Sequence, residues 1–111
     1  MFKEICLKSE TSAALKSEML FEIASERVSG TEIIRFNIYN RVNDSVFLRL
    51  TTAAKKHVRS FKSRGFIQFF ATGESFLSNE TEAKFLLNKY PELFKENALE
   101  SEKGFFLYIK L

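Results

Sequence analysis

Residues 18–39, EMLFEIASERVSGTEIIRFNIY, decide which fold the sequence predicts. The first half is rich in Ala, Leu, Met and Glu, and this composition favours a helix. Its helical wheel is poor, however, because Glu22 and Glu26 fall beside Met19. Strand alternation is cleaner over the same residues, and residues 31–39 alternate as well. We therefore interpret the stretch as two β-strands.

A two-residue turn at positions 29–30 joins these strands and sets their register. It places Ile23 opposite Phe36 on the apolar face. In the same register Arg27 lies opposite Glu32, so the charges pair as well. Agreement of apolar faces and charges is what a sheet with one buried face requires. The sequence thus predicts a β-hairpin.

Residues 45–50 alternate in the same way and add a third strand, so residues 18–50 form an antiparallel meander. Even-numbered residues of its last two strands face the core. The opposite face then carries Arg35 directly across from Arg49, together with the aromatic ring of Phe47. Like charges across a strand pair are destabilising unless something else compensates them, so this face is predicted to be a binding surface.

The other elements follow from apolar patterns and end signals. Thr51 is predicted to cap a helix, and Gly65 to follow its last turn. The predicted set beyond the meander comprises strands near 2–8, 66–71 and 104–110 and helices near 52–63 and 80–89. The sequence therefore predicts a single domain, residues 1–111, of α+β class with a mainly antiparallel sheet.

Charge is distributed unevenly along the chain. The formal net charge is only +3, but residues 27–64 carry nine Lys or Arg against Glu32 and Asp44. All six Arg residues lie in this segment. Such asymmetry bears on partners rather than on fold, and it indicates a polyanionic partner.

Several functional classes find little support in the sequence. One His and one Cys do not make a zinc site, and no triad or phosphate-binding loop is present, so we expect no metal, no cofactor and no catalysis. His57 and Cys6 are expected to be packing residues. Apolar runs are too short to span a membrane. The lone cysteine and the lack of a secretory leader predict a cytoplasmic, intracellular protein.

The leading hypothesis is a small non-catalytic module that binds nucleic acid, preferably single-stranded. Single-strand sites combine cations for the backbone with aromatic rings for the bases. The candidate binding residues are Arg35, Tyr39, Arg41, Phe47, Arg49, Lys55, Lys56, Arg59, Lys62 and Arg64.

Two alternatives stay open. The face around Arg35 and Phe47 is also compatible with packing under a helix or a second subunit, and the basic helix with an ordinary solvated surface. The second function, from another class, is a small assembly or accessory protein, for example of a virus or mobile element. It would act through protein contacts or as a homo-oligomer, with the strand near 104–110 offered at a sheet edge.

Two partial resemblances support the nucleic-acid hypothesis. Residues 64–70, RGFIQFF, resemble the start of the aromatic submotif of RNA-recognition domains, although Ile67 and Gln68 depart from it. The predicted order of strands and then a helix over residues 2–64 is similar to Pur-type and whirly-type single-strand-binding modules. No binding residue is carried over from either family.

Overall fold

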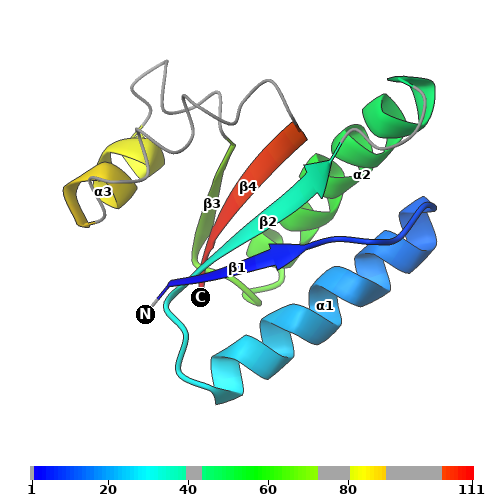
Figure 1. Cartoon of the computed structure of the whole chain (residues 1–111). Helices are drawn as coiled ribbons and strands as arrows, with labels where there is room; N and C mark the ends of the chain where they lie inside the picture. The colour runs from blue at the N-terminus through cyan, green and yellow to red at the C-terminus, as the bar shows by residue number, and fades with distance from the viewer. Residues whose placement is uncertain (1, 40–43, 73–80, 90–103) are drawn as a thin grey trace.

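The computed structural model describes residues 2–39, 44–72, 81–89 and 104–111 (Figure 1). The elements are β1 (Phe2–Cys6), α1 (Ser12–Val28), β2 (Ile33–Tyr39), α2 (Asp44–Ser63), β3 (Phe69–Thr72), α3 (Thr81–Lys89) and β4 (Gly104–Lys110). The four-stranded sheet has the order β1-β2-β4-β3. Strand β1 runs parallel to β2, whereas β4 is antiparallel to both β2 and β3. The α+β class is confirmed, with a mixed sheet rather than an antiparallel meander.

The predicted hairpin is wrong, because residues 18–28 belong to helix α1. The helix begins after Thr11, whose hydroxyl accepts a hydrogen bond from the backbone N–H of Ala14 at 3.2 Å. It buries Leu15, Met19 and Ile23, which lie four residues apart. Because β1 and β2 are parallel, the chain between them must cross over, and α1 is that crossover. The predicted turn at residues 29–30 therefore does not connect two strands, because these residues follow the end of α1.

The third predicted strand is also wrong, because residues 45–50 form the first turns of α2. Leu50 continues the stripe that the helix buries through Ala54, Val58 and Phe61. Thr51 is therefore not an N-cap; its hydroxyl donates to the carbonyl oxygen of Leu48 inside the helix. With this helix and α1 in place, the resemblance to the Pur-type and whirly-type order of elements no longer holds.

The elements predicted outside the meander agree with the structure more closely. The strands near 2–8, 66–71 and 104–110 correspond to β1, β3 and β4, and the helices near 52–63 and 80–89 to most of α2 and to α3. Gly65 follows α2 with φ of +80°, a conformation that suits glycine. Strand β4 lies inside the sheet, however, so it is not the exposed edge that the sequence predicted.

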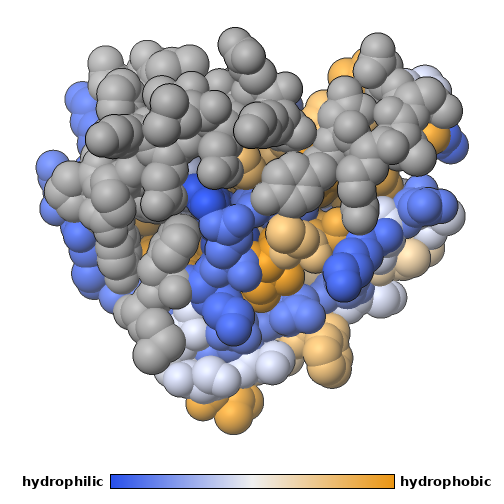
Figure 2. Space-filling view, in the orientation of Figure 1, coloured by the Kyte–Doolittle hydropathy of each residue, from blue (hydrophilic) through white to orange (hydrophobic). Residues whose placement is uncertain are grey.

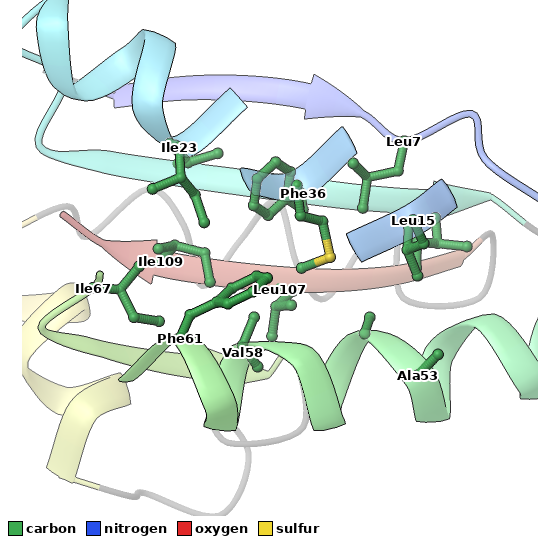
Figure 3. Close-up of a cluster of buried hydrophobic side chains, with 14 of the residues drawn as sticks. Leu7, Leu15, Ile23, Phe36, Ala53, Val58, Phe61, Ile67, Leu107 and Ile109 are labelled. Atoms are coloured by element: carbon green, nitrogen blue, oxygen red, sulfur yellow. The ribbon is translucent and has the colours of Figure 1, made fainter. Parts of the chain in front are cut away.

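The main core lies between the sheet and the pair α1 and α2 (Figure 3). As predicted, the even-numbered residues Ile34, Phe36 and Ile38 of β2 point into it. Leu107 and Ile109 of β4 do so as well. This cluster contains more of the buried apolar side chains than the cluster on the other face of the sheet. Each fully buried side chain of this size contributes about 1.5–3 kcal/mol.

A second, smaller cluster lies on the opposite face of the sheet, where α3 packs (Figure 1). Leu86 of α3 is buried against the strands, and Phe85 meets Phe69 of β3 edge to face with ring centroids 5.4 Å apart. The arrangement is therefore three-layered, with α1 and α2 on one face and α3 on the other. Among the described helices, none is long and apolar enough to cross a membrane.

Candidate nucleic-acid interface

The structure keeps six of the ten predicted binding residues together and separates Arg35 from them. Six cations lie on α2 or directly after it, and these remain together. Arg35 is buried under the other face of the sheet, and Phe47 packs partly against the main core. Arg41 and the side chain of Tyr39 lie outside the described residues.

The prediction that Arg35 lies on an exposed binding face is wrong, because only 3 % of its surface is exposed. Its neighbours across the sheet are Glu4 on β1 and Tyr108 on β4, not Arg49. Its guanidinium pairs with Glu4 and lies 5.1 Å from the ring centroid of Phe106. A residue so enclosed does not form an exposed face with Arg49.

The polar groups around Arg35 form a network that is buried except at Glu4, whose side chain is 38 % exposed. Asn37 donates from Nδ2 to the carboxylate of Glu4 at 2.6 Å. Burial acts to lower the pKa of Arg35, but hydrogen bonds and charge interactions with Tyr108 and Glu4 outweigh it, so its pKa is raised. The guanidinium is thus permanently charged and neutralised within the protein. Its role here is to connect strands β1, β2 and β4.

The cations that remain form one surface, which we call the cationic face of α2. It consists of Arg49, Lys55, Lys56, Arg59 and Lys62, with Arg64 just beyond the helix. At 3.6 residues per turn the five helical positions occupy roughly 140° of the circumference and about 20 Å of the axis. The buried stripe of Leu50, Ala54, Val58 and Phe61 lies on the other side.

In the described part of the chain, no carboxylate neutralises the charge of this face. The sequence has no Asp or Glu between Ser45 and Thr72. None of the six cations forms an ion pair with a carboxylate of the described residues. Lys55 is half-buried, with its ammonium 5.5 Å from the ring centroid of Phe105, and the other five are exposed. The face therefore presents a concentrated positive potential to solvent.

His57 borders the cationic face without adding charge to it. Its Nε2 lies 3.0 Å from the carbonyl oxygen of Ser12, and its ring stacks on Phe61. Burial lowers the pKa of His57, and the nearby Lys16 and Lys56 lower it further, against the raising effect of the Ser12 carbonyl. The imidazole is thus neutral at pH 7 and holds α1 against α2.

Cys6 is exposed, which contradicts the expectation of a packed thiol. Within the ranges that the structure describes, no group of three His, Cys, Asp or Glu could hold a metal ion.

The sequence interpretation missed a second surface, the outer side of α1. We call it the apolar face of α1, and it consists of Ala13, Ala14, Ser17, Phe21, Ala24, Ser25 and Val28. Phe21 is 70 % exposed and Val28 90 % exposed. Apolar side chains on two opposite sides of α1 blur its helical periodicity, and this is why the strand pattern seemed cleaner.

Comparison with protein-family models, with curated proteins and with solved structures yields no match to this chain.

Proposed function

We propose that this protein is a non-catalytic module that binds nucleic acid through the cationic face of α2. The observation that carries the proposal is the run from Ser45 to Thr72, which holds six cations, five exposed and one half-buried, and no carboxylate. Ordinary surface helices intersperse both signs of charge. A helix that displays only one sign over about 20 Å is suited to a partner with a repeating negative charge.

The backbone of nucleic acid is such a partner. A duplex carries one phosphate charge per about 1.7 Å of its axis, so a 20 Å helix face spans about a dozen phosphates. Contacts of this type give affinity and orientation but no sequence information. We therefore expect binding with little sequence preference and a strong dependence on salt.

Tyr39 and Phe47 are the aromatic rings that the sequence offers for stacking on bases. Phe47 packs partly against the main core, and the side chain of Tyr39 lies outside the described residues, so stacking on bases stays a prediction. Stacking was the reason to expect a preference for single strands. The proposal now rests on phosphate contacts, and the strand preference becomes a quantity to measure.

The decisive experiment is a salt titration of binding to a fluorescent oligonucleotide, as a single strand and as a duplex. Contact with about four phosphates predicts a log–log slope near −3.5 on the duplex and a shallower slope on the single strand. The double variant Lys56→Gln, Arg59→Gln should reduce the duplex slope by about 1.8.

A matched control removes the same charge elsewhere. Lys3 and Lys8 are exposed on or next to β1, away from α2, so Lys3→Gln, Lys8→Gln should leave the slope nearly unchanged. Equal losses in the two variants would mean that net charge alone drives binding. No measurable affinity at low salt would refute the proposal.

A second function, assembly through protein contacts, is favoured by a separate observation. This observation is the apolar face of α1, on the side of the helix opposite its buried residues.

A further inference from the structure

The outer side of α1 is uncharged along its whole length. The apolar face of α1 spans the side directly opposite the buried Leu15, Met19 and Ile23. Figure 2 shows hydrophobic side chains projecting from the lower edge of the molecule, where α1 lies in Figure 1. A solvated helix normally carries polar or charged residues on this side, so the pattern indicates a surface that is covered in the working protein.

The spacing of these residues fits a helix partner. Ala14, Ser17, Phe21, Ala24 and Val28 are all exposed and follow one another at intervals of three, four, three and four residues. This is the heptad spacing of the seam in a two-stranded coiled coil. Small side chains at positions 14, 17 and 24 let two helix backbones approach closely, while the larger ones interlock.

The charges at the two borders of the face identify the partner and its direction. One border carries Glu18 and Glu22, and the other carries Lys16 and Arg27. Two copies packed through this face with their α1 helices parallel bring each acidic border beside the partner's basic border. An antiparallel pair would set acid beside acid and base beside base. The borders are thus complementary to a second copy in the parallel orientation.

An open pocket of about 180 Å³ adjoins the basic border and extends the surface. It is lined by Leu20, Ile23, Ala24, Arg27 and Phe66. Arg27 donates a hydrogen bond to the carbonyl oxygen of Phe66, which ties the chain after α2 to α1. The pocket gives a projecting apolar side chain of a second copy a place to insert.

We propose that this protein forms a parallel two-fold homodimer through the apolar face of α1. The dimer does not depend on nucleic acid and stands whether or not the cationic face binds it. A single pair of 17-residue helices buries less than the roughly 800 Å² per partner of a standard interface. The association is therefore weak and depends on protein concentration.

Sedimentation velocity tests the dimer, with reductant present because Cys6 is exposed. Protein from about 1 µM to about 500 µM should pass from monomer to dimer, and the transition should persist at high salt, where phosphate contacts are lost. Phe21→Ser should weaken dimerisation at least about tenfold, since two buried rings are lost per dimer.

Leu48→Ser is the matched control, because Leu48 is 62 % exposed on α2, outside the proposed interface. It should leave the monomer–dimer equilibrium unchanged. A monomer at every concentration would overturn the proposal and leave the face to a different partner. A dimer that responds equally to both substitutions would overturn its location.

Cysteine cross-linking tests the orientation in a Cys6→Ser background. In a parallel seam each position faces its own copy within disulfide range, so Ser17→Cys and Val28→Cys should both form homodisulfides. Ser63→Cys, exposed at the end of α2, should not. An antiparallel pair aligns a residue with itself only at the crossing point, so failure at position 17 or 28 in a proven dimer would overturn the parallel arrangement.

Discussion

Helices α1 and α2 pack against each other on the same face of the sheet, yet their outer sides are opposite in character. Both bury an apolar stripe in one shared core. Outward, α1 presents uncharged residues with Phe21 and Val28 at the surface, whereas α2 presents five cations. Burial constrains only the inner sides, so the fold does not explain the difference outside. The outer sides are where the functions of the two helices should differ.

The partners of the charged side chains also differ between the two helices. Two of the three carboxylates of α1 accept local hydrogen bonds: Glu18 from the backbone N–H groups of Lys8 and Ser9 at 3.1 Å, and Glu26 from the hydroxyl of Thr31. The cations of α2 have no such partners among the described carboxylates. One helix is thus suited to an apolar partner and the other to an anionic one.

The largest expected effect is on unfolding free energy, in a comparison of a substitution on the inner side of α2 with one on the outer side of α1. Phe61→Ala removes a ring that is 1 % exposed and should cost about 3–5 kcal/mol of unfolding free energy. Phe21→Ala at a concentration where the protein is monomeric should change it by no more than about 0.5 kcal/mol. Urea unfolding measures both. A large loss for Phe21→Ala in the monomer would mean that the outer side of α1 is part of the core.

The next effect contrasts two arginines that the sequence interpretation placed on one face. Arg35→Ala leaves the Glu4 carboxylate without its cation and should cost about 3 kcal/mol, at the lower end for a broken buried pair because the Glu4 side chain is 38 % exposed.

Arg49→Ala, on the exposed side of α2, should stay within about 0.5 kcal/mol in stability while weakening oligonucleotide binding. Chemical denaturation and the binding assay together distinguish the two roles. Equal stability losses at the two positions would show that Arg49 is not a free surface cation.

The smallest effect concerns the contact between the two helices. The pKa of His57 is lower in the folded protein than its ordinary value of 6.5, mainly because of burial. The unfolded chain therefore binds the proton more readily, so the contribution of His57 to stability is complete above pH 6.5 and declines as the pH falls below it.

Between pH 7.5 and pH 5.5 the wild type should thus lose more unfolding free energy than His57→Gln. Denaturant titrations at the two pH values measure the difference. An identical loss in both proteins would mean that His57 titrates as it does in the unfolded chain.

Much of the fold was predictable because short patterns carry it. The alternation of β2 predicted the inward side chains of Ile34 and Phe36, and Gly65 predicted the end of α2. The four cations of α2 within the predicted helix were also predictable, since exposed positions follow from the spacing of the buried ones. The apolar face of α1 was not, because a helix with two apolar sides has no clear period.

The sequence by itself determined the amphipathic character of β2 and α2, the helix signals near Gly65, and the concentration of Lys and Arg in residues 27–64. These properties are local, since they depend on residues within a few turns or a few strand positions of one another. They were sufficient for the α+β class and for the helical cations Lys55, Lys56, Arg59 and Lys62, whereas Arg49 was predicted on a strand.

Only the tertiary structure decided which strands are neighbours. This pairing also decided that Arg35 is buried. Strand β2 lies between β1 from the start of the chain and β4 from its end, so the pairing partners of Arg35 are 31 residues before it and 73 after it. Local patterns carry no information about such distant pairing. The same pairing made residues 18–28 part of the crossover between β1 and β2. Parallel strands need such a long connection, and it is usually a helix.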